Sequence, residues 1–379
     1  MRIGGNWLER QETQAVLDCL ASGGFQALLV GGCVRNALLG VEVADVDIAT
    51  DARPETVSKL AEKAGFHVVP TGIGHGTVTV VSGGIPHEIT TFRRDVETDG
   101  RRAVVAFSDH IAEDAARRDF TMNALYARAD GQVIDPLGGL PDLLARRLRF
   151  VGDAETRIRE DYLRILRFFR FHAWYGDPQE GLDPEGLAAC AALSAGLETI
   201  SRERIGAEMR KLLAAPDPAP AVAAMAQAGV LTRILPGADP RALAPLVHLE
   251  GGLPPRWQRR LAVLGGQDRG ARLRLSNPEK RQLAALDEAL SGMDSPAVLG
   301  WRLGAEGGTD AVLARAALTG APPPAGWQAE VVRGATAEFP VKAADLPGLA
   351  GPTLGRRLKE LERRWCDSAL RLSKEQLLA

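Results

Sequence analysis

The sequence predicts an α+β protein in which a mixed sheet with helices is followed by an all-helical remainder. Short runs of apolar and β-branched residues, separated by glycine-rich turns, crowd the first 145 residues and are typical of strands. A helical period of apolar residues begins near residue 160, and the chain beyond residue 213 is rich in alanine with helical periodicity. With 379 residues and a hydrophobic fraction of 45%, the chain has room for more than one domain.

The first elements in order are a strand, a glycine turn and a helix. Residues 27–30 are predicted to form a buried strand, and Gly31 and Gly32 form the turn after it. Residues 34–39 then form a helix that Gly40 ends. A helix start next to a glycine turn is suited to phosphate. No Gly-Lys-Ser/Thr follows, and the third glycine of a dinucleotide fingerprint is absent, so neither of those phosphate motifs applies.

The next strand carries two aspartates. Residues 43–49 are predicted to form it, with Asp45 and Asp47 on one face because residues i and i+2 of a strand project together. Two adjacent carboxylates favour a hard cation such as Mg²⁺ between them. The competing interpretation is a solvated turn, against which the glycine lead-in argues. A turn that binds phosphate, together with carboxylates that bind a metal ion, predicts a nucleotidyl or phosphoryl transferase.

A hairpin supplies a third carboxylate. Residues 75–81 and 85–92 alternate like paired strands around a turn at residues 82–84, and Glu88 lies in the middle of the second strand. Alone, Glu88 would be interpreted as a surface residue on an open sheet face. With two aspartates upstream, it is a candidate third carboxylate of a two-metal site.

Basic residues follow. Residues 93–112 are polar and are predicted to form a long loop, of a length that is often functional. Arg117 and Arg118 precede an apolar segment and are candidates for a bidentate phosphate clamp, although paired arginines are usually a solvated face.

Residues 160–171 are predicted to form one helix with a basic arc. On a helical wheel Asp161, Arg164, Arg167 and Arg170 share an arc that rises about 13–14 Å and would suit a triphosphate. Aromatic and aliphatic residues lie on or beside that arc, which indicates that it faces a cleft: Leu163, Phe168 and Phe171. The alternative is a surface helix with an ion pair between Asp161 and Arg164.

Asp161 and Arg164 could also read a base. A carboxylate accepts hydrogen bonds and a guanidinium donates them. Cytosine and adenine each present an amine beside a ring acceptor, whereas uracil and guanine present a carbonyl beside an N–H. The pair would therefore accept C and A and reject U and G.

Several motifs in consistent order resemble one family. Residues 25–215 resemble the class II tRNA nucleotidyltransferases (CCA-adding enzymes) and the related bacterial poly(A) polymerases. The matching segments are GG-x-VR…D-x-D, HGT…HEITTFR, RRDFTMNALY, DPLGGLPDLLARRLRFVGD, EDYLRILRFFRF and ISRERIGAEMRKLL.

The resemblance implies a polymerase-beta-like head at residues 1–145, a helical neck with the base template at 146–215, and a helical, tRNA-binding body and tail at 216–379. It implies template-independent addition of CCA to the tRNA 3′ acceptor end from CTP and ATP, with Mg²⁺ as cofactor. Residues 93–112 would be the family's flexible loop. The roles it implies are metal binding and catalysis for Asp45 and Asp47, a third catalytic carboxylate for Glu88, and nucleotide binding for Gly32, Arg35, Arg118, Asp161, Arg164, Arg167 and Arg170.

Two departures from the family pattern stand out. Asn36 replaces the usual Asp after Val-Arg, and we expect the change to be tolerated because the amide keeps the hydrogen-bonding shape. No His-Asp dipeptide occurs in the sequence, so the phosphohydrolase domain of some relatives is expected to be missing.

Composition narrows the remaining possibilities. No apolar stretch suits a membrane span or a signal peptide, and the four cysteines have no metal-type spacing, so a cytoplasmic location without a protein partner is expected. The formal net charge of −2 does not indicate RNA binding, but residues 256–281 carry eight basic side chains and residues 356–374 carry seven. Such patches suit RNA phosphates. A general preference for arginine is the alternative explanation.

Two other functions stay open on the sequence. A poly(A) polymerase, or an enzyme that adds only CC or only A, would use the same chemistry. A non-catalytic RNA-binding protein is a third alternative, against which the presence of Asp45, Asp47 and Glu88 argues.

Overall fold

A seven-stranded mixed sheet lies near the N-terminus of the chain in a computed structural model, which describes residues 1–95 and 105–379. The strand order is β3-β4-β5-β2-β1-β8-β9. Of the pairs in this sheet, β2 with β5 is parallel and the others are antiparallel. The strands of this sheet are β1 (Leu28–Val30), β2 (Asp47–Thr50), β3 (His67–Gly72), β4 (Thr77–Ser82), β5 (Ile85–Thr91), β8 (Tyr126–Ala127) and β9 (Val133–Ile134).

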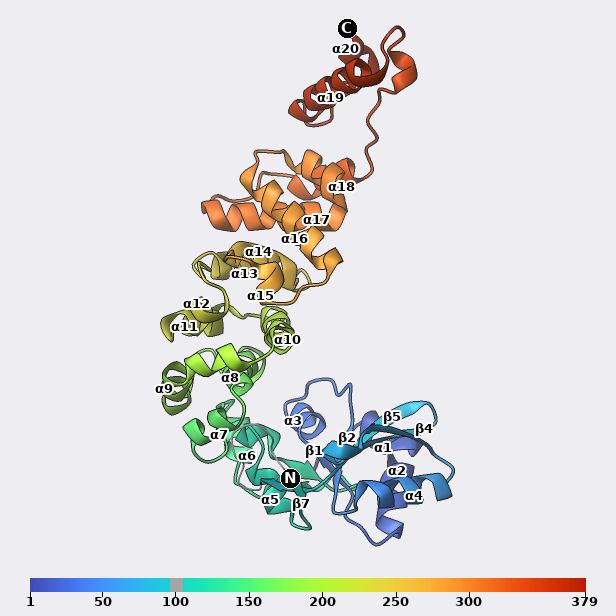
Figure 1. Cartoon of the computed structure of the whole chain (residues 1–379), viewed down its shortest axis with the longest axis vertical. Helices are drawn as coiled ribbons and strands as arrows, with labels where there is room; N and C mark the ends of the chain where they lie inside the picture. Colours follow the sequence, from blue (N-terminus) through green and yellow to red (C-terminus); the bar gives the residue numbers. More distant parts are fainter. Residues whose placement is uncertain (96–104) are drawn as a thin grey trace. The chain divides into compact units, whose positions relative to one another are not determined.

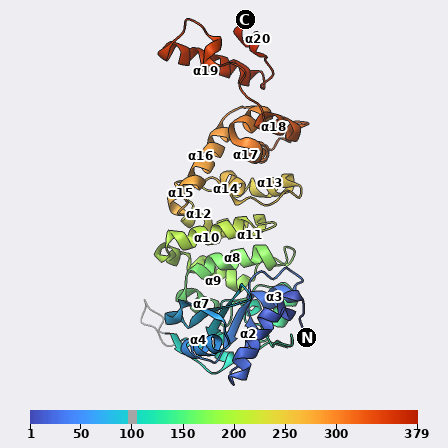
Figure 2. The same cartoon turned by 90° about the vertical axis from the view of Figure 1, so that its right-hand side faces the viewer.

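Helices cover the sheet and extend the same unit, which runs from Met1 to Leu193. Helices α2 and α4 contact each other and β4, and lie side by side in Figure 2. Val16, Leu17 and Leu20 of α2 are buried, and Pro54 at the start of α4 suits a first helical turn. The helices of this unit are α1 (Asn6–Glu9), α2 (Gln11–Ser22), α3 (Gly32–Leu38), α4 (Pro54–Lys63), α5 (Ile111–Ala116), α6 (Leu140–Leu144), α7 (Ala154–Glu160), α8 (Leu163–Tyr175) and α9 (Pro184–Ala192), with 3₁₀ turns η1 (Ile73–His75) and η2 (Thr121–Asn123).

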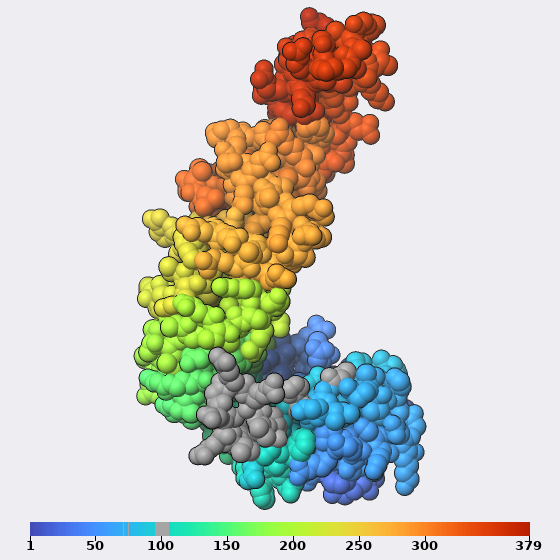
Figure 3. Space-filling model, in the orientation of Figure 1, coloured from blue at the N-terminus to red at the C-terminus, as the bar shows by residue number. Residues whose placement is uncertain are grey.

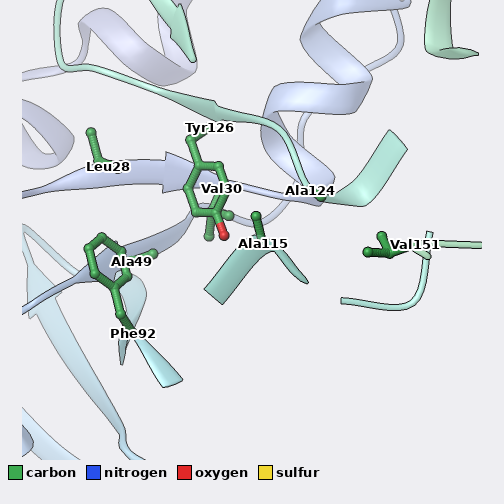
Figure 4. Close-up of a cluster of buried hydrophobic side chains, with 8 residues drawn as sticks. All are labelled: Leu28, Val30, Ala49, Phe92, Ala115, Ala124, Tyr126 and Val151. Carbon is green, nitrogen blue, oxygen red and sulfur yellow. The ribbon is translucent and has the colours of Figure 1, made fainter. Parts of the chain in front are cut away.

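The core of the sheet joins distant parts of the sequence. Apolar residues of β1, β2 and β8 pack with Phe92, Ala115 and Val151 (Figure 4). Tyr126 is fully buried in this cluster, and its hydroxyl donates a hydrogen bond to Asp114 at 2.7 Å. The core therefore fixes α5 against the sheet next to the strands that carry the predicted carboxylates.

The second unit, Ser194 to Ala379, is helical throughout its described residues (Figure 1). Its long helices carry a buried aliphatic stripe, and Trp365 lies in a cluster with Leu361 and Val341. Figure 3 shows α19 and α20 as an exposed surface, coloured red. The helices are α10 (Arg202–Leu213), α11 (Ala219–Gln227), α12 (Val230–Ile234), α13 (Leu243–Glu250), α14 (Trp257–Leu264), α15 (Arg269–Arg272), α16 (Asn277–Ser291), α17 (Pro296–Thr319), α18 (Trp327–Ala335), α19 (Gly351–Asp367) and α20 (Lys374–Leu378), with 3₁₀ turns η3 (Ser194–Thr199) and η4 (Ala343–Asp345).

The predicted fold class is confirmed, with three local differences. The strand predicted at 43–49 begins only at Asp47. The loop predicted at 93–112 contains β6 (Arg93–Asp95), β7 (Val105–Phe107) and the start of α5, and its residues 96–104 lie outside the described part of the chain. The helix predicted at 160–171 is broken, because α7 ends at Glu160 and α8 begins at Leu163.

The break has a local cause. Asp161 has an extended backbone, with φ −153° and ψ 104°, and its Oδ1 accepts a hydrogen bond from the Leu163 backbone N–H at 3.1 Å. Aspartate side chains often compete with helix continuation in this way. The chain divides into its two compact units between Leu193 and Ser194. The functional domain boundaries at residues 145 and 215 stay a prediction. No helix among the described residues is long and apolar enough to cross a membrane.

Candidate active site

The predicted glycine turn joins β1 to α3 and packs closely against an arginine. Gly31 has φ 69°, a conformation that glycine adopts without strain, and α3 begins at Gly32. A Cβ atom on Gly31 would lie 3.4 Å from Nη1 of Arg118. The turn therefore lies beside the arginine that the sequence predicted as a phosphate ligand.

Two of the predicted carboxylates lie side by side. Asp47 opens β2 and is in register with Glu88 of the parallel strand β5. Residues in register on neighbouring strands project from the same face. Burial raises the pKa of Asp47 to about 6, with further raising by the charges of Glu88 and Asp45 and lowering by Arg118. Negative charge is therefore concentrated at this point and only partly compensated.

Asp45 is placed differently from the prediction. It precedes β2 and is exposed, so it does not share a strand face with Asp47. The reason lies in the pairing, because β1 aligns with residues 48 and 49 of β2 and β5 aligns from Asp47 onward. Within the described part of the chain, residues 43–46 have no partner strand. Within the described residues, no three His, Cys, Asp or Glu side chains form a ready cluster for a metal ion.

The donor set nevertheless fits a divalent cation. Carboxylate oxygens are the hard ligands that Mg²⁺ and similar ions prefer. The charges of Glu88 and Asp45 add to the effect of burial on the pKa of Asp47, so a positive charge beside these carboxylates would reduce their repulsion. A divalent ion held by Asp47, with Glu88 and Asp45 in support, would relieve that repulsion.

Arg118 is anchored by the sheet core. Its Nη2 donates to Asp114 Oδ2 at 2.9 Å and its Nε to the Tyr126 hydroxyl at 3.1 Å. Asp114 is almost fully buried, whereas the Arg118 side chain is 19% exposed. Arg118 is thus held between the glycine turn and Asp47, with Nη1 toward the turn.

Arg35 is buried, and four of its five N–H donors have acceptors among the described residues. It is only 6% exposed, and it donates to Asn36 Oδ1, to Asn123 Oδ1 at 2.5 Å and to the Tyr175 hydroxyl at 2.8 Å. Its Cζ atom lies 4.0 Å from the centroid of the Tyr175 ring. This geometry ties Arg35 to the protein, whereas the sequence predicted it as a nucleotide contact.

Asp119 links the head segment to α8. Its Oδ2 accepts from Arg167 Nε at 2.7 Å, and its Oδ1 accepts from Asn123 Nδ2 at 2.9 Å. Burial alone would raise the pKa of Asp119, but the charge of Arg167 and these hydrogen bonds hold it below its usual range. Arg167, predicted as part of a triphosphate track, is therefore paired, although its side chain is 31% exposed.

Arg164 is partly engaged and keeps free hydrogen-bond donors. Its Nη1 donates to the Arg157 carbonyl and to Glu160 Oε2, and its Nη2 donates to the Arg117 carbonyl at 3.2 Å. Arg164 therefore forms an ion pair with Glu160, and not with Asp161 as the alternative interpretation of the helix proposed. Among the described residues, the Nε–H and one Nη2 hydrogen of Arg164 have no acceptor, so the side chain is fixed but can still donate.

The aromatic residues beside the basic arc do not mark a cleft. Phe168 is fully buried and Phe171 is 5% exposed. Phe168 stacks on Phe150 with ring centroids 5.4 Å apart, and Phe171 packs on Phe120 at 5.3 Å. The inference from these residues was wrong, because α8 is buried on this side as well, against the segment around Phe120.

Sequence reasoning missed four polar residues of this network. Asp114, Asp119, Asn123 and Tyr175 were not singled out, although Asp119 and Asn123 stand in the quoted RRDFTMNALY segment. For Asp119 and Asn123 the signal is a polar residue in the apolar segment that follows the paired arginines, whereas no local pattern marks Asp114 or Tyr175. Arg170, which was predicted, lies on α8 with Cζ 4.3 Å from the Phe171 ring centroid.

Two arginines of the predicted basic patch at residues 256–281 are buried, whereas Arg274, Lys280 and Arg281 are exposed. Arg259 and Arg260 are each 1% exposed and pair with Glu250. Arg259 also donates to Asp310 at 3.0 Å. The prediction of RNA contact is wrong for these two arginines, because their charges are neutralised inside the second unit.

The second patch, on α19, divides into paired and exposed residues. Arg357 pairs with Glu360, and Arg364 donates to the carbonyls at the end of α20. Three basic side chains at spacings of three and four residues are exposed on one helical face and have no ion pair among the described residues: Arg356, Lys359 and Arg363. This row is called the α19 row below.

Comparison with known proteins gives a consistent result. Residues 27–149 match the model of the "Poly A polymerase head domain", and residues 181–241 match the "Probable RNA and SrmB- binding site of polymerase A". The CCA-adding enzyme of Geobacillus stearothermophilus is 36% identical over 349 residues, which are 88% of this chain and 83% of that protein.

The chain is also similar to a solved structure and to a shorter stretch of another relative. The crystal structure of the Bacillus stearothermophilus CCA-adding enzyme in complex with CTP superposes with a TM-score of 0.74 and 31% identity, over 97% of this chain and 95% of that one. The CCA-adding enzyme of Leuconostoc citreum is 46% identical over 217 residues, 56% of this chain. That match spans about half of the relative, 52% of its length.

Proposed function

The chain belongs to the family of CCA-adding enzymes, the class II tRNA nucleotidyltransferases, and we propose that it adds C, C and A to the 3′ end of tRNA. The nucleotides would come from CTP and ATP, with release of pyrophosphate and without a nucleic-acid template. The observation that carries the proposal is the pairing of Asp47 with Glu88 beside Arg118, in the same unit as Arg164.

The catalytic carboxylates are Asp45, Asp47 and Glu88 in this proposal. The head fold implies use of a divalent metal ion, and we assign Mg²⁺, held by Asp45 and Asp47 with Glu88 as the third carboxylate. The ion would lower the pKa of the attacking 3′-hydroxyl and offset charge on the triphosphate. The concentration of negative charge around Asp47 supports this assignment.

The nucleotide's phosphates and sugar would be held by Gly32 and Arg118. A glycine turn permits close approach of the backbone, and Arg118 is fixed by Asp114 and Tyr126 with Nη1 toward the turn. Arg167 and Arg170 would support the nucleotide from α8. Arg35, which lies in the helix that begins at the glycine turn, would also contact the nucleotide, and one of its Nη1 hydrogens has no acceptor among the described residues.

The base would be selected by Asp161 and Arg164. The two unused N–H groups of Arg164 are the donors that a ring nitrogen of cytosine or adenine requires. The fixed position of its guanidinium favours selection, since a mispaired polar group at a rigid site is costly. Recognition of C and A would then need no template strand.

The remainder of the chain would bind the tRNA. We propose residues 1–145 as the catalytic head, 146–215 as the neck with the base template, and 216–379 as the tRNA-binding body and tail. The α19 row offers positive charge to RNA phosphates. A cavity of about 740 Å³ in the second unit offers three more arginines, Arg202, Arg233 and Arg272. The four cysteines are free, which supports the proposed cytoplasmic location.

The test is nucleotide incorporation on three tRNA transcripts, ending at the discriminator base, after one C and after two Cs. Each receives CTP, ATP, UTP or GTP singly, and then CTP with ATP, in the presence of Mg²⁺. Addition of C, C and A that then stops is the expected result. Asp45→Ala and Asp47→Ala should abolish incorporation, and turnover that survives both changes would overturn the metal assignment.

A second candidate is a poly(A) polymerase, which the match to the poly(A) polymerase head model favours. Long A tails on any RNA would establish it in place of CCA addition. Stopping after CC, or activity only on the CC-ending tRNA, would mean a partial tRNA nucleotidyltransferase. No incorporation at all would leave the non-catalytic RNA-binding alternative.

A further inference from the structure

Arg35 is a buried cation that no carboxylate of the described residues pairs with. Its hydrogen-bond acceptors are two neutral amides, Asn36 and Asn123, and the Tyr175 hydroxyl. Burial lowers the pKa of Arg35, which Tyr175 opposes and Arg170 reinforces. Because a buried charge needs compensation, the face of the Tyr175 ring, 4.0 Å from the guanidinium carbon, supplies an important part of it.

Tyr175 ties Arg35 to the C-terminal end of α8. It is the last residue of that helix, and Arg35 lies in α3, which begins directly after Gly31 of the glycine turn. A single side chain therefore connects the helix of Arg164 to the turn proposed for phosphate.

A second connection runs through Asn123. Arg35 donates to Asn123, Asn123 donates to Asp119, and Asp119 accepts from Arg167 of α8. Arg167 and Tyr175 are eight residues apart, about 12 Å along the helix axis. Arg35 thus holds α8 at two separate points, which fixes both the position and the tilt of the helix.

On the basis of the proposed function, we propose that Tyr175 is a positioning residue for base selection. By holding the end of α8 against Arg35, it sets the distance between the base-reading Arg164 and the carboxylates of β2 and β5. Small misplacements at a reacting centre cost large factors in rate. Loss of the hydroxyl would therefore act on catalysis and on base preference through the helix.

The experiment compares Tyr175→Phe with Tyr162→Phe. The Tyr162 hydroxyl has no partner among the described residues, so Tyr162→Phe controls for loss of a phenol at the other end of the same helix. For Tyr175→Phe we expect kcat with CTP on tRNA to fall about tenfold while KM for CTP changes less than about threefold. Incorporation of UTP and GTP relative to CTP should rise at least about threefold, and Tyr162→Phe should match the wild type.

A rescue variant tests whether Arg35 is the group that Tyr175 holds. In Tyr175→Phe, the further change Asn36→Asp places a carboxylate where Arg35 already donates from Nε and Nη2. A charge-assisted hydrogen bond is stronger than a neutral one, so kcat should recover to within about threefold of wild type. No recovery would contradict the role of Arg35 as the held residue.

Two results would overturn the proposal. One is an unchanged kcat and base preference in folded Tyr175→Phe. The other is a fall in melting temperature that accounts for all lost activity with preference intact. Calorimetric binding of CTP and of UTP, without tRNA, gives the preference directly. A wild-type protein that binds CTP over UTP but adds nothing to tRNA would refute the proposed function and leave this inference standing.

Discussion

The two units each contain a network of arginines and carboxylates, and the networks differ in exposure and in what they connect. In the second unit Glu250 and Asp310 neutralise Arg259, and all three side chains are at most 3% exposed. In the first unit Asp119 holds Arg167, whose side chain is 31% exposed. The first network connects two elements of the candidate active site, whereas the second connects helices only.

Arg260 shows what the buried network does. It donates to the carbonyls of Leu213, Ala215 and Pro216, where α10 ends, and pairs with Glu250 at the end of α13. Arg260 therefore satisfies carbonyl groups at the end of α10 and links them to the end of α13, and all of its N–H donors have protein acceptors. The comparison teaches that exposure and pairing, and not residue type, separate arginines that serve the fold from those that can serve a ligand.

The largest expected effect is on the buried network. Asp310→Asn leaves Arg256 and Arg259 without their shared carboxylate. Breaking a buried ion pair from one side costs about 3–5 kcal/mol, so the melting temperature of the helical signal should fall strongly. The measurement is thermal unfolding followed by circular dichroism.

Glu306→Gln is the matched control for that change. Glu306 also pairs with Arg256, but its side chain is 69% exposed. Exposed pairs contribute about 0–1 kcal/mol, so this variant should unfold close to the wild type. Equal destabilisation by the two variants would remove the distinction between the networks.

An intermediate loss of stability is expected in the network of Asp119 and Arg167 in the first unit. Asp119→Asn removes the charge that Arg167 pairs with but keeps an acceptor for Asn123. We expect a loss of about 1–3 kcal/mol, smaller than for Asp310→Asn because water reaches Arg167. The rate of incorporation should fall about tenfold, since α8 loses one of the two links through which Arg35 holds it. An unchanged rate would mean that this network serves only the fold.

The same variant has a pH signature. The pKa of Asp119 is held below its usual range by Arg167, so its stabilising contribution is complete above the unfolded pKa, about 4. It is lost as the pH falls through the lower, folded pKa. Asp119→Asn should therefore flatten the loss of stability below about pH 4, measured by urea unfolding at several pH values.

The smallest effect on stability is expected for the α19 row. Replacing Arg356, Lys359 and Arg363 with glutamine removes exposed charges without ion-pair partners, so unfolding should change by less than about 0.5 kcal/mol per site. Affinity for tRNA should fall, and the slope of log affinity against log salt should become shallower by about 2–3. The double change of Arg357 and Arg371, which are paired with Glu360 and Glu330, is the control and should alter the slope less.

The sequence predicted correctly those features that depend on residues close together in the chain. The hairpin around Gly83 and the position of Glu88 in its second strand follow from alternation and turn residues. Glu88 was a candidate partner of the aspartates, and the structure pairs it in register with Asp47. The strand length was not predictable, because it depends on which residues β1 and β5 reach. Asp45 was predicted to lie within this strand, but the strand begins at Asp47.

Long-range pairing accounts for the other differences. Arg259 is bound to Asp310, 51 positions along the chain, and no local pattern reports such a partner. Arg35 is likewise bound to Tyr175, 140 positions away. A cluster of arginines therefore looks the same in a sequence whether the side chains are buried or exposed in the structure.

The central claim is that protein side chains, with Arg164 foremost, read the incoming base. The direct measurement is the ratio of CTP and ATP incorporation to UTP and GTP incorporation by Arg164→Ala, together with its affinity for tRNA. The account predicts at least a tenfold loss of preference, with tRNA affinity within about twofold of wild type. An unchanged preference in a folded, tRNA-binding Arg164→Ala protein would contradict it.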